Sequence, residues 1–219
     1  MTWIKICGTT NLEDAQLAAE AGADALGFIF APSARRITPT AAAEIIPILP
    51  SKVEKVGVFA ERSDARARRI AASADLTGIQ FQRGCTPDAF EQLKAKASAL
   101  TVIHVLSIGD MARIAGFRLR KNGRRWIDRV MFDNGSGGTG RSFDWKQGRE
   151  IVRIFSMEFG APIIIAGGLT PDNVGEAIRL FRPWGVDVAS GVESRPGKKD
   201  PQKLRAFIQA VREAEKSLP

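Results

Sequence analysis

The sequence predicts an α/β chain that folds as a single (β/α)8 barrel, the TIM-barrel architecture. Two observations carry this prediction. Short runs rich in isoleucine and valine alternate with alanine-rich helical runs along all 219 residues, and such alternation is typical of parallel strands joined by helical crossovers. There are eight strand candidates, which is the number that closes this barrel and leaves about 27 residues for each strand–helix unit.

The predicted strands are short and apolar. In several of them the apolar residues follow one another without alternation, as in strands buried on both faces. In chain order we expect strands at Trp3–Ile6, Ala25–Phe30, Lys55–Phe59, Gly78–Phe81, Thr101–Val105, Trp126–Phe132, Pro162–Ala166 and Val186–Ala189.

Helix-start signals fall between these strands. Asn11 can cap a helix that runs to Ala21, and Gly22 closes it. The segment Ser107 to Arg125 is basic and irregular, and we expect a short helix and an exposed loop there. Four prolines stand near the starts of helical runs, where a missing N–H costs little, and each follows a residue that can cap a helix: Thr38-Pro39, Thr86-Pro87, Thr170-Pro171 and Asp200-Pro201.

An open, doubly wound sheet is the alternative fold. A dinucleotide-binding sheet of that kind would need a G-x-G-x-x-G turn after the first strand, and Cys7-Gly8-Thr9-Thr10 is not such a turn. No linker, low-complexity tract or change of composition divides the chain. We therefore expect one domain over residues 1–219.

The composition excludes several classes of protein. Hydrophobic residues make up 44% and charged residues 26% of the chain, which is ordinary globular usage. The two cysteines, Cys7 and Cys85, and the single histidine, His104, stand in no metal-ligand spacing. The longest apolar runs, such as Pro162 to Ala166, are too short to span a membrane, and no signal peptide precedes the first strand. We expect a cytoplasmic protein without a metal site or a membrane partner.

The chain is basic, with a formal net charge of +8. Such a charge is compatible with a nucleic-acid partner, an anionic substrate or a basic surface. Seven arginines and lysines lie between Arg113 and Arg129, but few aromatic residues interleave with the basic ones. This pattern favours a solvated basic face over a nucleic-acid surface.

In this barrel, function collects on the loops that follow the carboxyl ends of the strands. Gly167-Gly168 and Ser190-Gly191 follow the seventh and eighth strands, where glycines let backbone N–H groups approach a phosphate; they can also be no more than tight turns. Arg35 and Arg36 follow the second strand. They can clamp a second anion such as a carboxylate, or they can form a solvated surface pair.

Two residues are candidates for acid–base chemistry. Cys7 and Asp133 each follow an apolar run, so each is expected at the rim of the barrel and partly buried. A thiol and a carboxyl can share proton transfer when their pKa values are tuned. Alternatively, Cys7 is a small hydrophobe and Asp133 a loop or cap residue.

The first and eighth strands predict an internal ion pair. Residues two apart in a strand share a face, so Lys5 and Cys7 point into the barrel while Ile4 and Ile6 face the helices. A closed barrel places the eighth strand beside the first, with Asp187 pointing inward. Because a buried ammonium is costly unless it is paired, we predict a Lys5–Asp187 ion pair below the candidate site. The alternative is that Asp187 only holds a loop and that Lys5 reaches solvent at the lower rim of the barrel.

Several sequence blocks together identify a resemblance that spans nearly the whole chain. The blocks are Lys5-Ile6-Cys7-Gly8, Ala23-Asp24-Ala25-Leu26-Gly27-Phe28-Ile29-Phe30, Gly137-Gly138-Thr139-Gly140-Arg141-Ser142-Phe143-Asp144-Trp145, Ala166-Gly167-Gly168-Leu169-Thr170-Pro171-Asp172-Asn173-Val174, Ser190-Gly191-Val192-Glu193 and Pro196-Gly197-Lys198-Lys199-Asp200. In this order they resemble the phosphoribosylanthranilate isomerase family of tryptophan biosynthesis.

The resemblance implies a cofactor-free isomerase that converts N-(5-phosphoribosyl)anthranilate to 1-(2-carboxyphenylamino)-1-deoxyribulose 5-phosphate by an Amadori rearrangement. It implies that Cys7 is the general base at C2 of the ribose and that Asp133 is the general acid at the ring oxygen. It also implies that Arg36 meets the anthranilate carboxylate and that Gly168 and Gly191 form the phosphate cradle. The implied partner is a small phosphorylated substrate, and the protein would act as a monomer or a homodimer.

One stretch departs from the family pattern. The family usually carries Leu-His-Gly after the fourth strand, where this chain has Phe81-Gln82-Arg83-Gly84, and we assign no substrate role to Gln82 or Arg83. The alternative function is a degenerate phosphosugar-binding barrel, or a basic nucleic-acid-binding module, without isomerase activity. Ribulose-phosphate epimerases would need metal-binding histidines, and the related histidine-pathway isomerase would carry an aspartate in place of Cys7.

Overall fold

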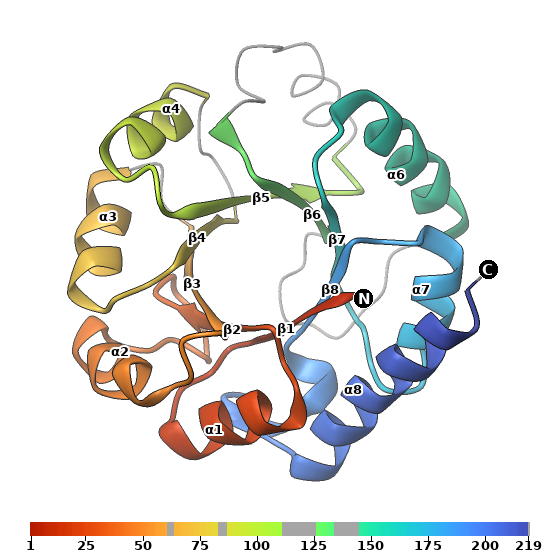
Figure 1. Cartoon of the computed structure of the whole chain (residues 1–219), viewed down its shortest axis with the longest axis horizontal. Coiled ribbons are helices and arrows are strands. Elements are labelled where there is room, and N and C mark those ends of the chain that lie inside the picture. Colours follow the sequence, from red (N-terminus) through yellow and green to blue (C-terminus); the bar gives the residue numbers. More distant parts are fainter. Residues whose placement is uncertain (61–63, 83–86, 111–125, 134–144, 219) are drawn as a thin grey trace.

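The computed structural model describes residues 1–60, 64–82, 87–110, 126–133 and 145–218. Eight parallel strands close into a barrel in chain order, with the eighth hydrogen-bonded to the first. They form the inner ring in Figure 1, and the helices form the outer ring. The strands are β1 (Trp3–Cys7), β2 (Ala25–Ile29), β3 (Glu54–Phe59), β4 (Gly78–Phe81), β5 (Thr101–Ser107), β6 (Arg129–Asp133), β7 (Ile163–Ile165) and β8 (Gly185–Val188). The predicted fold class is confirmed.

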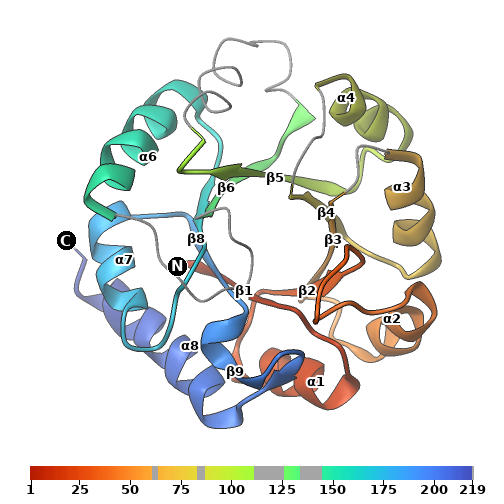
Figure 2. The same ribbon diagram turned by 180° about the vertical axis from the view of Figure 1, so that it is seen from behind.

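The outer ring and the connections contain helices and one added hairpin. The helices are α1 (Leu12–Ala21), α2 (Pro39–Ile45), η1 (Ile46–Ile48), α3 (Asp64–Ser73), α4 (Pro87–Lys96), α6 (Trp145–Phe159), α7 (Val174–Phe181), η3 (Ser190–Val192) and α8 (Pro201–Lys216). Between η3 and α8 a short antiparallel hairpin is inserted, formed by β9 (Glu193–Arg195) and β10 (Lys198–Lys199). Figure 2 shows β9 beside α8 and α1.

Most helix-start predictions are confirmed. The Asn11 side chain accepts a hydrogen bond from the Asp14 N–H, and Thr38 and Asp200 cap α2 and α8 through their side chains. Thr170 is an exception, because α7 begins at Val174 and the Thr170 N–H instead donates to the Asn173 side chain at 2.8 Å. The predicted cap at Thr86 lies outside the described residues. In the segment Ser107 to Arg125, where a short helix and a loop were predicted, Ser107 ends β5 and residues 111–125 lie outside the described residues.

The strand bounds differ most from prediction at the sixth strand. It begins at Arg129 rather than Trp126. Just before this strand, the Val102 N–H donates to the Asp128 carboxylate at 2.7 Å. A side-chain oxygen therefore takes the place of the backbone carbonyl that would accept this N–H in a regular strand pair. The seventh strand excludes Pro162, whose ring removes the N–H that a ladder needs; its carbonyl still accepts the Val130 N–H at 3.0 Å.

The core has two layers. One fills the space between the strands and the helices and includes Ile4 and Ile6. The other lies inside the barrel and contains Trp3, Ala25, Val56, Ile103, Val105, Met131, Ile164 and Ala166. At the amino ends of the strands, the Arg129 guanidinium lies over the Trp3 and Trp184 rings and pairs with Glu54 at 2.7 Å. Cys7 and Asp133 are the last residues of β1 and β6 and so lie at the opposite end of the barrel.

Candidate active site

Cys7 is the last residue of β1, and its thiol lies among inward-facing groups of the barrel. The residue is only 6% exposed. A Cβ built on its neighbour Gly27 would lie 2.7 Å from the Cys7 sulfur and 3.1 Å from Lys5 Cε. Only glycine therefore leaves room for this thiol beside the lysine. The sequence prediction placed Cys7 at the rim, but it did not single out Gly27.

The predicted Lys5–Asp187 pair is present. Lys5 and Asp187 are register partners on β1 and β8, and Lys5 Nζ lies 2.7 Å from Asp187 Oδ1. The Lys5 side chain is fully buried. Burial on its own lowers the pKa of Lys5, but Asp187 and Cys7 outweigh it, and the pKa stands above its ordinary value. Lys5 is thus favoured as a cation beside the thiol.

The pKa of the Cys7 thiol is raised, first of all by burial. The charge of Lys5 lowers that pKa, Asp187 raises it again, and Lys199 lowers it. Since the ordinary value is already 9.0, the resting side chain at neutral pH is the thiol. The two buried lysines are the groups that favour its thiolate.

Asp133 ends β6, as Cys7 ends β1, so the two residues lie at the same end of the barrel. Asp133 is buried, and its carbonyl accepts the Ile108 N–H at 3.0 Å. The rim position predicted for both residues is therefore correct, but both are buried rather than partly buried. The glycine-rich segment that follows Asp133 lies within 134–144, outside the described residues, and a catalytic role for either side chain stays a prediction.

The two glycine loops meet, as predicted for neighbouring strands. Gly167 and Gly168 have positive φ values of +88° and +71°, which favour glycine. A Cβ on Gly191 would overlap the carbonyl oxygen of Leu169, so the loops after β7 and β8 are packed backbone to backbone. A pocket of about 590 Å³ lies between these loops and α8, with Lys203 in its wall.

The two arginines after β2 have different surroundings. Arg35 is buried, and its guanidinium pairs with the Glu193 carboxylate. Its Nε lies 2.9 Å from both carboxylate oxygens, and its Nη2 lies 2.7 Å from Oε2. It is therefore neither a free anion clamp nor half of a surface pair. Arg36 is exposed, and it alone of the two remains available to an external anion.

Sequence reasoning missed two further charged residues, Glu193 and Lys199. Both are buried on the added hairpin, and Lys199 Nζ lies 2.5 Å from the Cys7 carbonyl oxygen. Their only signal was their place in sequence blocks shared with a known family. His104, in contrast, is directed at the helix layer, where its ring lies edge-on to Phe90 at 5.0 Å, so it does not reach this end of the barrel.

No helix in the described part of the chain is long and apolar enough to cross a bilayer. The same residues contain no group of three or more His, Cys, Asp or Glu side chains placed to hold a metal ion.

An eight-stranded parallel barrel with a thiol, a carboxyl group and two facing glycine loops at one end has the architecture of a TIM-barrel enzyme. The family described as N-(5'-phosphoribosyl)anthranilate isomerase matches residues 4–210. The N-(5'-phosphoribosyl)anthranilate isomerase of Desulforudis audaxviator is 41% identical over 218 residues, which cover 98% of this chain and 100% of the relative. The chain therefore belongs to the N-(5'-phosphoribosyl)anthranilate isomerase family.

Solved structures agree with this assignment. A phosphoribosyl anthranilate isomerase in complex with reduced 1-(o-carboxyphenylamino)-1-deoxyribulose 5-phosphate has a TM-score of 0.81 at 33% identity, and the match covers 97% of this chain and 100% of that one. Monomers generated from the dimeric enzyme of Thermotoga maritima match with a TM-score of 0.79 at 33% identity, with the same coverage. The resemblance noted in the sequence is thus confirmed.

Proposed function

We propose that this chain isomerises N-(5'-phosphoribosyl)anthranilate to 1-(2-carboxyphenylamino)-1-deoxyribulose 5-phosphate, a step of tryptophan biosynthesis. The observation that carries the proposal is the pair of strand-end residues, Cys7 and Asp133, at one end of a barrel of this family. A thiol beside buried cations and a carboxyl on a separate strand can act on two atoms of one sugar. The reaction requires such a pair.

In the proposed mechanism, Asp133 acts first as the general acid. It donates a proton to the furanose ring oxygen, the bond from C1 to that oxygen breaks, and the nitrogen lone pair forms an iminium with C1. The positive nitrogen makes the hydrogen on C2 acidic, because the electron pair of the C2–H bond can move toward the nitrogen when the proton leaves. Cys7, once its resting thiol has lost a proton to solvent, removes the C2 proton as the thiolate. The resulting enol-amine then takes up a proton at C1 and loses the proton of its C2 hydroxyl, which gives the ketone. Each of the two groups is expected to contribute roughly 10²–10⁴-fold to the rate.

The remaining site residues are proposed to bind the two anionic ends of the substrate. Arg36 is exposed at the end of the loop after β2 and would meet the anthranilate carboxylate. Gly168 and Gly191, in the two packed loops, would present backbone N–H groups to the phosphate. Gly168 is favoured by its positive φ, and a side chain at Gly191 would overlap the Leu169 carbonyl.

We further propose that the whole chain acts as one barrel domain in the cytoplasm, as a monomer or a homodimer, on this small phosphorylated substrate and without a nucleic-acid partner. The free, buried Cys7 supports this location, because a reducing compartment keeps a thiol available as a base. The solved relative from Thermotoga maritima is described as dimeric. Analytical ultracentrifugation of the purified chain would distinguish the two oligomeric states.

The decisive test is the loss of phosphoribosylanthranilate fluorescence with purified protein. We expect turnover by the wild type, and less than about a tenth of its kcat in Cys7→Ser and in Asp133→Asn. Absence of turnover in the wild type would refute the function, and retained turnover in one variant would refute that residue's role. If duplex DNA bound instead, with an affinity that fell steeply with salt, the nucleic-acid alternative would be favoured.

A further inference from the structure

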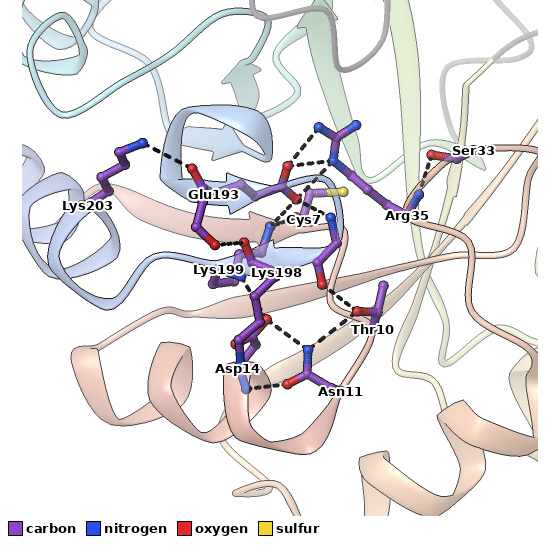
Figure 3. Close-up of polar contacts among 12 residues, drawn as sticks. Cys7, Thr10, Asn11, Asp14, Ser33, Arg35, Glu193, Lys198, Lys199 and Lys203 are labelled. Carbon is purple, nitrogen blue, oxygen red and sulfur yellow. Dashed lines mark hydrogen bonds and ion pairs between the residues drawn. The ribbon is translucent and has the colours of Figure 1, made fainter.

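The hairpin formed by β9 and β10 folds back over the end of β1. Its Gly197 carbonyl accepts a hydrogen bond from the Thr10 hydroxyl at 2.6 Å. The Lys199 N–H donates to Asp14 Oδ2 at 2.8 Å, and Lys198 Nζ reaches Asp14 Oδ1 at 2.9 Å. Figure 3 shows these contacts along the loop that follows Cys7 and at the first turn of α1. The hairpin is therefore fixed to the segment that carries the thiol.

Lys199 is the part of this hairpin that touches Cys7. Its side chain is fully buried, and its ammonium donates to the Cys7 carbonyl at 2.5 Å and to Glu193 Oε1 at 3.1 Å. Burial lowers the pKa of Lys199, although the charges of Glu193 and Cys7 act in the opposite direction. The hydrogen bond from the buried Lys199 ammonium therefore fixes the Cys7 carbonyl in place.

Glu193 holds Lys199 in position and joins it to Arg35. Its carboxylate accepts three hydrogen bonds from Arg35 and one from Lys199, and it also accepts the Gly197 N–H at 3.3 Å. Figure 3 shows the carboxylate between the guanidinium and the ammonium. Glu193 also stands two residues after Gly191, so the same cluster continues into the loop after β8.

Arg35, from the loop after β2, is the third member of a charged cluster that also contains Glu193 and Lys199. A Cβ on Gly8, the residue after Cys7, would lie 2.7 Å from Arg35 Cδ, so the arginine stem lies directly against this backbone. The next residue is Arg36. The cluster therefore connects three chain segments: the end of β1, the loop after β2 and the loop after β8.

We propose that Lys199, held by Glu193, is a positioning residue that fixes Cys7 for proton abstraction. The inference rests on the proposed role of Cys7 as the base. Lys199 touches the Cys7 backbone and not the reacting atoms, so it acts through Cys7. Its charge also acts on the thiol together with Lys5 of β1 and Asp187 of β8, while Glu193 of β9 and Arg35 of the β2–α2 loop stand behind it.

The test compares Lys199→Met with Lys198→Met in the full-length protein. Lys198 is the neighbouring hairpin lysine, and it pairs with Glu13 and Asp14 rather than with Cys7. For Lys199→Met we expect kcat to fall about 10- to 100-fold, with KM within about threefold of the wild type. Lys198→Met is expected to keep wild-type kcat.

A second readout follows the thiol without substrate. Iodoacetamide alkylation of the Cys7 peptide, measured by mass spectrometry at one mildly alkaline pH, reports the thiolate fraction. Removing the Lys199 charge should slow it about tenfold, the change produced by a one-unit rise in the pKa of the thiol. A purely structural lysine would leave this rate unchanged. If Lys199→Met does not fold, Lys199→Gln removes the same charge and keeps an N–H donor for the carbonyl.

An unchanged or faster alkylation rate in Lys199→Met would overturn the inference. So would an equal loss of kcat in Lys198→Met, because the hairpin as a whole would then be responsible. The proposed function fails by a different result, namely the absence of turnover in the wild type or full turnover in Cys7→Ser. The alkylation series is independent of turnover, so the two failures are distinguishable.

Discussion

The Lys5–Asp187 pair offers a sharp test of how this barrel tolerates charge in its interior. Lys5→Met removes a fully buried ammonium and leaves the Asp187 carboxylate, whose side chain is 11% exposed, without its 2.7 Å partner. Stranding one charge of a buried pair costs about 3–5 kcal/mol. For a chain of this size, such a loss lowers the melting temperature by roughly 6–20 °C.

The measurement is a double-mutant cycle in urea, with Lys5→Met, Asp187→Leu and the double variant. If the pair is the cause, the double variant recovers part of the loss, with a coupling of about 1–3 kcal/mol. The surface pair Arg153–Glu150, whose side chains are 58% and 60% exposed, is the matched control, and its cycle should show no more than about 0.5 kcal/mol. Additive losses in the Lys5–Asp187 cycle would refute the reasoning.

The pH dependence of this pair gives an independent check. Because the folded state raises the pKa of Lys5 above its ordinary value of 10.5, the stabilisation is complete below pH 10.5 and is lost as the pH rises through the folded value. The wild type should therefore lose stability in this alkaline range. Lys5→Met should lose less of it there, as measured by urea unfolding at several pH values.

Three further predictions concern the candidate site. Arg36→Ala should raise KM more than it lowers kcat, because a carboxylate contact acts on the ground state and the transition state alike. Arg35→Ala should instead destabilise the fold, because it leaves the buried Glu193 carboxylate without its partner. Equal effects of the two variants in steady-state kinetics and in urea unfolding would contradict this contrast. Gly191→Ala should displace the loop from the Leu169 carbonyl, with KM rising and stability falling by about 1–3 kcal/mol, and unchanged values of both would contradict the packed-loop geometry. Burial alone would raise the pKa of Glu193, but Arg35 and Lys199 hold that pKa below 4.5. The stabilisation that Glu193 contributes is therefore present above pH 4.5 and is lost as the pH falls through the folded value. Glu193→Gln should lose less stability than the wild type in this acid range, as measured by urea unfolding at several pH values.

The features that the sequence predicted are those that follow from local pattern and barrel closure. Strand ends set the rim positions of Cys7 and Asp133. The two-residue period of a strand, together with closure of the eighth strand on the first, was enough to pair Lys5 with Asp187. These inferences need only the periodicity and the order of the strands, and a parallel barrel fixes both.

The features that were missed depend on contacts between distant side chains. Glu193 reaches Arg35 across 158 sequence positions, and Lys199 reaches Cys7 across 192. No periodicity in the sequence predicts a short hairpin between the last strand of the barrel and the last helix. Arg35 and its neighbour Arg36 therefore looked equivalent, and only the position of Glu193 separates a buried structural arginine from an exposed one.

The buried charges near Cys7 bear on its proposed role as the general base. Charged side chains with little or no exposure gather around the end of β1 in the described part of the barrel: the cations Lys5, Lys199 and Arg35 and the carboxylates Asp187, Glu193 and Asp14. Asp14 pairs with the less buried Lys198, so this set together with Lys198 carries an excess positive charge. Burial opposes the thiolate of Cys7, but the thiolate would balance that excess, and a substrate with two anionic ends is attracted by the same field. The hydrogen bonds that fix these cations therefore also favour the charged states that the proposed reaction uses.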